Sequence, residues 1–388
     1  MAAHSFQSST AAVGLSAVID VFDQNHLFDE VDNPAVLQLS RLGGQPGFAS
    51  TRAIEKSTGI RLRRVLKADV TPLDVAIAAC HRLQQVTETQ LGDFEQILLC
   101  HSHTDPLACD RLASEITSEL GLPEHSIRSF NHGCTGFLKL LTEGAQLLEG
   151  RDQGIRIALL SVETPEFWHD AADRLFCGIV SAGASAAVVE VGRGLPLHTI
   201  HSNDFSVPDE RRPNPDPLFR KETTDVYDFQ GQPCHRSIMR MNAEPVFLNG
   251  IELMLEHLRT ALLSITPTPG QRVIVAPHQP SGKLLKALVA AARNEFPKVE
   301  FLNNLEYYGN TISSSVPTLV SRLTEVLNRN GLQPLRDGDH LILLAAGICM
   351  ANMSDHMSAG HACLRWQDNA LNTAAGSTSE NVTIAASR

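Results

Sequence analysis

The chain has 388 residues, of which 43% are hydrophobic and 19% are charged, and its formal net charge is −11. This length fits two domains or one duplicated fold, and the composition is that of a globular protein rather than a disordered one. The acidic balance disfavours non-specific nucleic-acid binding, and no apolar run reaches the roughly 20 residues that span a membrane. The polar first ten residues lack a secretion signal, so a cytoplasmic protein is expected.

The first half of the chain alternates predicted helices with apolar strands. Residues 66–90 have an apolar face at helical spacing, and Thr71 stands where an N-cap is expected. Further helices are expected near 107–120 and at 135–149. Strands are predicted at Ile97–Cys100, 126–130, Ile155–Val162 and Ala184–Val191.

Residues 203–236 interrupt this alternation with five prolines, many charges and no hydrophobic period, so a long connection or a surface excursion is expected. The residues from Gln367 onward are polar and small, which predicts a mobile tail. Between them, the second half is expected to form helices near 244–264, 282–294 and 311–328, and strands at Val273–Ala276, 299–302, 341–346 and 360–365.

The two halves echo one another. Ile97–Cys100 and Val273–Ala276 are both buried strands that end in polar residues, and each is followed by a helix, a short strand and a second helix. Cys134 and Asn310 stand at matching distances beyond these two strands. The pattern predicts a duplicated α/β fold, although any two units of this kind share some likeness.

Eight cysteines are scattered along the chain without a CxxC pair, which indicates reduced thiols and gives no support for a metal site. Most are expected to pack as small hydrophobes. Cys134 differs, because it lies between Gly133 and Gly136 where a short strand turns into a helix. The helix dipole is expected to lower the pKa of a thiol there and to favour a nucleophilic thiolate. A core cysteine at a turn is the alternative.

A histidine and an asparagine hold comparable positions in the second half. His278 ends a buried strand, where ligands of α/β sheets gather, and Asn310 enters a helix, where an N-cap is the ordinary explanation. Pseudo-twofold packing would bring both together with Cys134 in one cleft. Cys with His indicates acyl transfer through a thioester. His with Asn provides two neutral donors for the enolate that forms when a malonyl thioester loses carbon dioxide.

At these residues the sequence resembles the thiolase superfamily, specifically its β-ketoacyl-acyl-carrier-protein synthase III branch, from about residue 50 to residue 366. Six motifs carry the resemblance in the family's order. They are Ser57–Arg64, similar to Thr-Gly-Ile-x-x-Arg; Gly133–Phe137, similar to the nucleophile motif; Asp173-Arg174; Met241-Asn242 with Val246-Phe247; His278-Gln279; and Tyr308–Thr311, which matches Tyr-Gly-Asn-Thr.

The resemblance implies an α/β, thiolase-like five-layer αβαβα fold built from two pseudo-repeated halves, and a homodimer. Residues 1–195 would form the half that carries the nucleophile, residues 196–366 the half that carries His and Asn, and residues 367–388 the polar tail. No cofactor is implied beyond the substrates, which would be acyl-coenzyme A or an acyl carrier protein, together with a malonyl thioester.

The resemblance also implies a Cys-His-Asn triad. Cys134 would take the acyl group, while His278 and Asn310 would bind the malonyl thioester carbonyl and promote decarboxylation. The resulting enolate would attack the thioester on Cys134. The oxyanion hole would use the backbone N–H of Cys134 and one near Gly347.

Two segments depart from the family's pattern. The family's Phe-Gly-Asp-Gly-Ala-Gly segment is here Ile179–Ser185, and its closing Gly-Gly-Gly-Phe segment is here Ala346–Met350. The chemistry is kept while the pocket walls differ. We therefore expect a specialised primer or acceptor, in fatty-acid or polyketide-type metabolism, rather than the housekeeping starter reaction.

Coenzyme A and acyl carrier protein are anionic, so an acidic chain needs a local basic rim to receive them. Arg61 and Arg64, and Lys283 and Lys286 on the helix after His278, are the candidate substrate- and carrier-binding residues. Solvated surface charges are the alternative reading of these side chains.

Two other functions stay open at this point. An acyltransferase of the same fold would pass the acyl group from Cys134 to an alcohol or amine without forming a carbon–carbon bond. A degenerate structural partner in a heterodimeric synthase would do no chemistry, but the intact triad disfavours it.

Overall fold

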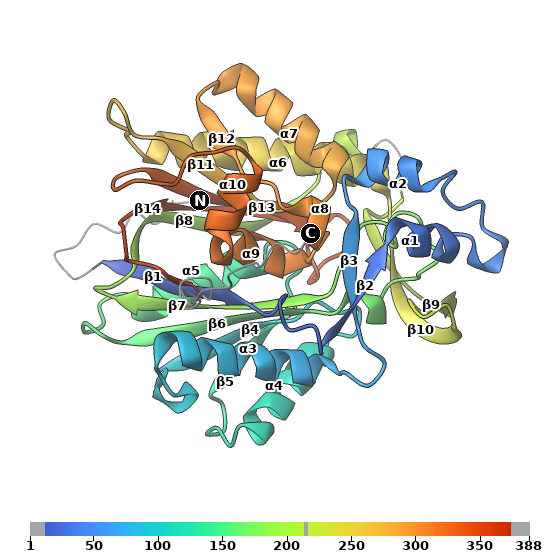
Figure 1. The fold of residues 1–388 in the computed structure, drawn as a ribbon, viewed down its shortest axis with the longest axis horizontal. Helices are drawn as coiled ribbons and strands as arrows, with labels where there is room; N and C mark the ends of the chain where they lie inside the picture. Colours follow the sequence, from blue (N-terminus) through green and yellow to red (C-terminus); the bar gives the residue numbers. More distant parts are fainter. Residues whose placement is uncertain (1–11, 213–215, 374–388) are drawn as a thin grey trace, which may run out of the picture.

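The computed structural model describes residues 12–212 and 216–373, and in this part of the chain the fold has five layers (Figure 1). Two sheets face each other across a central layer of helices, and further helices cover the outer face of each sheet. The predicted five-layer αβαβα architecture is confirmed for the described residues.

The first sheet comes from the N-terminal half. Its strand order is β5 (Ile127–Phe130), β4 (Gln96–Cys100), β6 (Arg156–Glu163), β7 (Gly183–Val191) and β1 (Val13–Asp20). β4 is parallel to β5 and β6, whereas β7 is antiparallel to β6 and β1. Helices cover both faces of this sheet, which is why its inner strands are continuous apolar runs in the sequence.

The second sheet repeats this order and these directions. It runs β12 (Val299–Phe301), β11 (Val273–Pro277), β13 (His340–Ile348), β14 (His356–Arg365) and β8 (Leu195–Ser206). β11 is parallel to β12 and β13, and β14 is antiparallel to β13 and β8. The sheets join where Gly14 and Leu15 of β1 pair with Pro196 and Leu195. The predicted duplication is therefore present in the sheet topology.

Helices complete the layers. On the outer face of the first sheet lie α3 (Pro72–Thr87) and α4 (Ala108–Glu119), and on that of the second lie α6 (Ala243–Ser264) and α7 (Gly282–Glu295). Between the sheets lie α5 (Gly136–Leu148) and α9 (Ser315–Ser321), followed by α10 (Leu323–Arg329). One apolar cluster links both sheets to these central helices, for example through Leu98, Leu141, Leu319 and Leu343. Among the described helices, none has both the length and the apolar character that crossing a bilayer requires.

Shorter elements flank the layers at one end of the molecule. They are β2 (Phe28–Asp32), α1 (Asn33–Leu39), α2 (Thr51–Thr58), β3 (Leu62–Leu66), β9 (Phe219–Tyr227), β10 (Pro233–Met241), and α8 (Leu305–Tyr308). β2 pairs with β3, and β9 pairs with β10, both antiparallel. These elements surround the segments that carry the candidate site.

Most predicted elements are confirmed to within a few residues, and one helix start is confirmed in atomic detail. The Thr71 hydroxyl accepts a hydrogen bond from the Asp74 backbone N–H, while the Asp74 carboxylate accepts one from the Thr71 N–H. This reciprocal capping box satisfies two N–H groups that would otherwise lack intrahelical partners.

Of the two alternatives predicted for residues 203–236, the long connection is wrong, and the surface excursion takes the form of a regular hairpin. This segment completes β8 and then forms β9 and the first part of β10, which pair as a hairpin; residues 213–215 lie outside the described part. The hairpin is largely polar and exposed between its ends, so no apolar alternation marks its strands. Its buried ends supply Phe219, Met239 and Met241 to the candidate site.

Two further expectations need correction. The predicted helix at 311–328 is divided into a short 3₁₀ turn, α9 and α10. Ile312 in the turn has a positive φ of 51°, and Arg322, between α9 and α10, has a non-helical φ of −110° and ψ of 25°. The predicted mobile tail begins too early, since Asn372–Thr373 form β15, which pairs with β1. The remainder of that tail, residues 374–388, lies outside the described residues.

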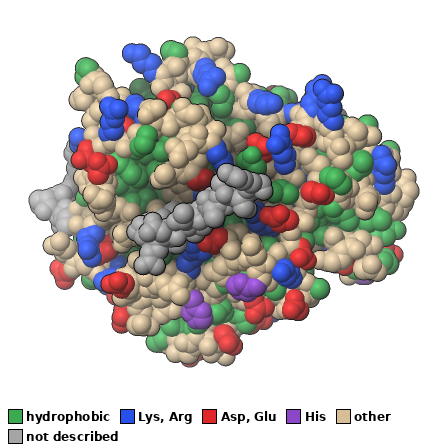
Figure 2. Space-filling view, viewed as in Figure 1, with side chains coloured by type: hydrophobic (Ala, Val, Ile, Leu, Met, Phe, Trp, Pro, Cys, Tyr) green, Lys and Arg blue, Asp and Glu red, His purple; other side chains and the backbone are tan. Residues whose placement is uncertain are grey.

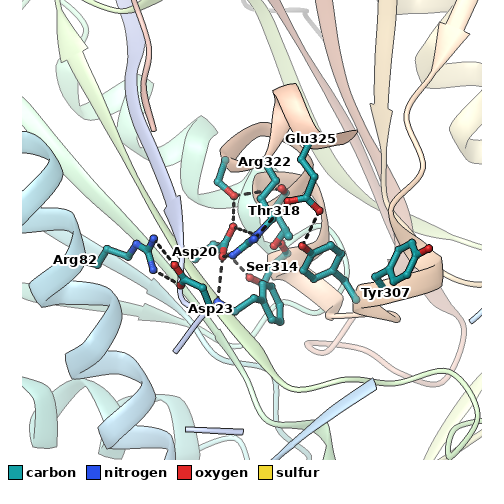
Figure 3. A network of polar contacts seen from close by, with 12 residues as sticks. Asp20, Asp23, Arg82, Tyr307, Ser314, Thr318, Arg322 and Glu325 are labelled. Carbon is teal, nitrogen blue, oxygen red and sulfur yellow. Dashed lines mark hydrogen bonds and ion pairs between the residues drawn. The ribbon is translucent and has the colours of Figure 1, made fainter. Parts of the chain in front are cut away.

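A polar network ties β1 to the helices that follow the site (Figure 3). The Asp20 carboxylate, which is buried, accepts hydrogen bonds of 2.6 and 2.8 Å from Arg322 and another from Ser321. Arg322 also lies 5.3 Å from the centre of the Tyr308 ring, and the Tyr308 hydroxyl donates to Glu325. These contacts hold the Tyr-Gly-Asn-Thr segment against the rest of the fold.

Candidate active site

One cavity of about 210 Å³ is lined by all three candidate catalytic residues, Cys134, His278 and Asn310, and by Gly347. Cys134 comes from the N-terminal half, whereas the other three come from the C-terminal half. The cavity therefore forms where the two repeats meet, as the pseudo-twofold arrangement predicts.

Close backbone packing positions Cys134. Gly133 has a φ of +84°, and a Cβ there would lie 2.6 Å from Ile348 Cγ2 and 2.8 Å from its carbonyl oxygen, so only glycine fits. The Thr135 hydroxyl lies 2.8 Å from that of Ser358, which donates to the Ile348 carbonyl. The nucleophile segment is thus fastened to the end of β13 just before α5 begins.

The expected low pKa of Cys134 is not what the structure gives. Burial raises the pKa of its thiol to about 12, and the nearby Glu163 carboxyl acts in the same direction, while hydrogen bonding from the Ile348 backbone opposes them. Desolvation therefore outweighs the helix dipole, and the thiol is protonated at neutral pH. A thiolate has to form together with proton transfer to a base when substrate is bound.

His278 directly follows β11 and is fully buried. Its backbone N–H donates to the Leu344 carbonyl at 2.6 Å, and its Nδ1 lies 2.6 Å from the Ser315 hydroxyl, which also donates to the Ile312 carbonyl. Its Nε2 has no hydrogen-bond partner within the described residues. Burial lowers the pKa of His278 to about 3, so the ring is neutral at physiological pH.

Asn310 presents its amide to the same cavity. Its backbone is hydrogen-bonded to the segment Ile179–Ser181: its N–H donates to the Ile179 carbonyl, and its carbonyl accepts from the Ser181 N–H. Its side-chain oxygen accepts from the Ile312 N–H at 2.9 Å, and its Nδ2 lies 3.3 Å from the Pro280 carbonyl. The acceptor is thereby occupied, and the second proton of Nδ2 is left to serve as a donor.

Strain is localised beside Asn310. Ile312 is β-branched, yet its φ of 51° lies in the left-handed region, where such residues are outliers. Its N–H holds the Asn310 oxygen and its carbonyl accepts from Ser315. Ile312 thus orients Asn310 directly and His278 through Ser315. Backbone strain of this kind tends to be retained at functional sites.

Gly347 allows β13 to pass directly beside the nucleophile. A Cβ at this position would lie 2.6 Å from both the Cβ and the Sγ of Cys134. The structure thus places backbone of β13 against the thiol, at the site where an oxyanion hole is predicted. Which N–H groups serve it stays a prediction.

The candidate docking residues do not share one environment. Arg61 is exposed but paired with Glu55 and Glu306, and Lys283 and Lys286 are exposed on α7. Gly59 and Gly282 touch through their backbones, which brings the Arg61 segment close to the start of α7. Figure 2 shows Lys and Arg side chains interspersed with Asp and Glu on the face it presents, without one large basic area.

Arg64 is largely buried, which argues against a docking role. Its guanidinium donates to the Tyr307 carbonyl, pairs with Glu30 and lies over the rings of Phe22 and Tyr308. The adjacent Arg63 is buried as well and donates to the Gly178 carbonyl. The expected cluster of basic side chains after Gly59 is therefore mostly structural.

Sequence reasoning missed the aromatic part of the cavity wall. In this part the ring centres of Trp168 and His169 are 4.1 Å apart, and those of His169 and Phe176 are 4.2 Å apart. The hairpin and α6 add Phe219, Met239, Met241 and Phe247 to the wall. The motif Met241-Asn242 with Val246-Phe247, and the segments Ile179–Ser185 and Ala346–Met350, were the parts of this wall that the sequence indicated. Within the described residues, no group of three His, Cys, Asp or Glu side chains is arranged to hold a metal ion.

Comparisons with known proteins agree with this geometry. Residues 268–354 match the family model described as 3-oxoacyl-[acyl-carrier-protein (ACP)] synthase III C terminal. The β-ketoacyl-[acyl-carrier-protein] synthase III of Synechococcus sp. is 27% identical over 319 residues, covering 81% of this chain and 87% of the relative. That of Prochlorococcus marinus is 25% identical over 273 residues, covering 69% and 77%.

Solved structures show the same fold. The 3-oxoacyl-(acyl carrier protein) synthase III of Pseudomonas aeruginosa superposes with a TM-score of 0.66 at 20% identity, covering 92% of this chain and 98% of that chain. The priming β-ketosynthase of the R1128 polyketide pathway superposes with a TM-score of 0.68 at 21% identity, covering 94% and 98%. The chain is therefore similar in sequence to β-ketoacyl-[acyl-carrier-protein] synthase III enzymes, and it shares their fold.

Proposed function

We propose that this enzyme is an acyltransferase of the condensing type, which joins an acyl group held on Cys134 to a malonyl-type thioester by decarboxylative Claisen condensation. The observation that carries the proposal is the single cavity that Cys134 shares with His278 and Asn310. A nucleophile beside two neutral donors fits a reaction that needs both a covalent acyl intermediate and a stabilised enolate.

In the first half-reaction, His278 Nε2 accepts the Cys134 proton as the sulfur attacks the acyl thioester. Burial keeps the imidazole neutral, so its Nε2 can serve as the base when Nδ1–H donates to Ser315. The tetrahedral intermediate collapses, the carrier thiol leaves, and the leaving thiolate takes the proton back from His278. Cys134 then carries the acyl group.

In the second half-reaction, His278 and Asn310 donate hydrogen bonds to the malonyl thioester carbonyl. The Ser315 hydroxyl can instead donate to Nδ1, which places the imidazole proton on Nε2 as this step requires. The bond to the carboxylate breaks, carbon dioxide leaves, and the enolate carbon attacks the acyl thioester. The carbon–sulfur bond to Cys134 then breaks, and the thiolate takes one proton from water, which restores the thiol.

Release of labelled carbon dioxide distinguishes condensation from simple acyl transfer. Acylated protein is mixed with malonyl thioester labelled in its free carboxylate, and both labelled gas and a 3-oxoacyl product are expected. Acyl transfer to an alcohol or amine without gas release would instead identify the acyltransferase alternative. The occupied oxygen and available amide of Asn310 favour condensation, because simple transfer has less need of a second donor.

The proposed partners are acyl-coenzyme A or an acyl carrier protein, with Arg61, Lys283 and Lys286 on the receiving surface.

A homodimer is also proposed. β5 is an edge strand of the first sheet in the described structure. The unpaired backbone groups of such an edge are suited to pair with a second copy. Sedimentation analysis of the purified protein tests this, and a monomer at micromolar concentration would contradict it.

A further inference from the structure

Two polar atoms in the apolar cavity wall have no role in the chemistry described above. Trp168 and His169 each expose only 1% of their surface, and both line the cavity. Trp168 Nε1 and His169 Nε2 are buried and lack hydrogen-bond partners within residues 12–212 and 216–373. A buried polar atom without a partner is costly, so such a pair in a substrate cavity calls for an explanation.

The hydrogen-bonding character of both nitrogens follows from their contacts. His169 Nδ1 lies 2.9 Å from the Pro165 carbonyl, which can only accept, so Nδ1 carries the proton. Burial lowers the pKa of His169 to about 3, so the ring has no second proton and Nε2 presents a lone pair. The indole Nε1 of Trp168 can only donate. The two ring centres are 4.1 Å apart, so neighbouring rings of the wall carry one unpaired acceptor and one unpaired donor.

A hydroxyl group matches this pair, because it can donate to His169 Nε2 and accept from Trp168 Nε1–H at the same time. The rest of the cavity favours a flat apolar body. Phe176 continues the ring ladder, and Met239 and Met241 contribute sulfur atoms, which make favourable contacts with aromatic rings. The cavity of about 210 Å³ exceeds the roughly 150 Å³ that accommodates benzene in an engineered cavity.

We propose that the acyl group loaded on Cys134 is a hydroxylated aromatic acyl group about the size of a single ring, whose hydroxyl is bound by His169 and Trp168. This deepens the proposed function and rests on Cys134 as the acyl carrier. His169 and Trp168 are specificity-determining residues here, and neither takes part in bond making or breaking.

The test compares acylation by benzoyl-coenzyme A with acylation by its 2-, 3- and 4-hydroxy forms. The rate of mass gain on the protein is measured at several substrate concentrations to give kcat/KM for the acylation step. At least one hydroxybenzoyl form is expected to exceed benzoyl by about tenfold or more, because the unsubstituted ring leaves both nitrogens unpaired. Equal or faster acylation by benzoyl-coenzyme A than by every hydroxy form would overturn the proposal.

Two variants test whether His169 in the cavity wall causes the preference for hydroxybenzoyl over benzoyl groups. His169→Phe keeps an aromatic ring but removes the acceptor, and it is expected to bring the hydroxybenzoyl-to-benzoyl ratio close to one. His81→Phe, on the exposed side of α3, is the matched control and is expected to keep the native ratio. An unchanged ratio in a folded His169→Phe protein would contradict the assignment.

A binding experiment separates this proposal from the catalytic one. Calorimetry with the Cys134→Ala variant, which cannot be acylated, is expected to show phenol binding at least about tenfold more tightly than benzene. Phenol binding that is no tighter than benzene would refute the polar subsite even if Cys134 is acylated normally. Conversely, a preference for phenol alongside native protein that never becomes acylated would refute the proposed function and leave the subsite standing.

Discussion

Gly347→Ala is expected to disable the active site while leaving the fold intact. The added Cβ would lie 2.6 Å from the Cβ and from the Sγ of Cys134. Non-bonded carbon atoms prefer about 3.5–4.0 Å, so one side has to move by roughly 1 Å. β13 is a buried strand paired with β14 at Gly347 and Ser358, and it resists displacement, so Cys134 is expected to move.

The size of the effect follows from that displacement. A misplacement of about 1 Å at a reacting atom costs roughly a hundredfold in rate, or about 2.7 kcal/mol in activation free energy. We therefore expect acylation of Cys134 in Gly347→Ala to be about a hundredfold slower than in the native protein. The thermal midpoint is expected to fall by only a few degrees, because the clash is with one side chain at a cavity.

The assay is the rate of mass gain at Cys134 from an acyl-coenzyme A. Gly92→Ala is the neutral control, since a Cβ there meets nothing within 4 Å. Gly144→Ala in α5 is the control for destabilisation, because its Cβ would lie 2.9 Å from Val189 in the core away from the site. It should lower the thermal midpoint yet keep the native acylation rate. Acylation of Gly347→Ala within threefold of native would refute the reasoning.

Three further predictions follow from the geometry. Cys134→Ala is expected to abolish acylation, whereas Asn310→Ala is expected to keep acylation and lose decarboxylation; mass spectrometry and labelled-gas release measure the two steps, and equal loss of both in Asn310→Ala would contradict its role. Stability is expected to peak near pH 6.5, as measured by denaturant midpoints at pH 4, 6.5 and 8.5. Buried histidines with folded pKa values of about 3 to 4 stay neutral while the unfolded chain binds protons below about pH 6.5, so stability falls on acidification. Buried glutamates with folded pKa values of about 7 to 8 act in the opposite direction, because the stability they contribute is lost as pH rises. A stability that only rises with pH would contradict the glutamate assignment, and one that only falls would contradict the histidine assignment. Thr71→Ala is expected to lower the free energy of unfolding by about 1 kcal/mol through loss of the capping box, with no change in acylation rate; an unchanged denaturant midpoint would refute this. The groups that set the pH profile are His169, His257, His278 and His361 on the acid side and Glu163 and Glu166 on the alkaline side.

The sequence was informative where the hydrophobic pattern alone determines which segments form strands and which residues follow them. Buried strands are apolar runs. Cys134 and Asn310 stand at matching distances beyond two such strands, and His278 directly follows one, so their meeting in one cavity could be predicted from the duplication. The equal strand order of the two sheets is the physical reason that this prediction worked.

The sequence was uninformative wherever the outcome depends on what surrounds a side chain. The helix dipole suggested a low pKa for Cys134, but the degree of burial, which reverses the direction, is a tertiary property. Arg64 was predicted to be a surface charge, because its contacts with the rings of Phe22 and Tyr308 form only in the folded structure. Trp168 and His169 carry no motif, because a specificity pocket is set by shape and not by spacing.

Carbon dioxide release from the acylated enzyme tests the central claim most directly. Protein carrying one acyl group on Cys134 is mixed with carboxylate-labelled malonyl thioester, and gas, acyl-enzyme and product are measured together. We predict one molecule of labelled carbon dioxide and one of 3-oxoacyl product for each acyl group lost from Cys134. Loss of the acyl group to an alcohol or amine without labelled gas would contradict the account.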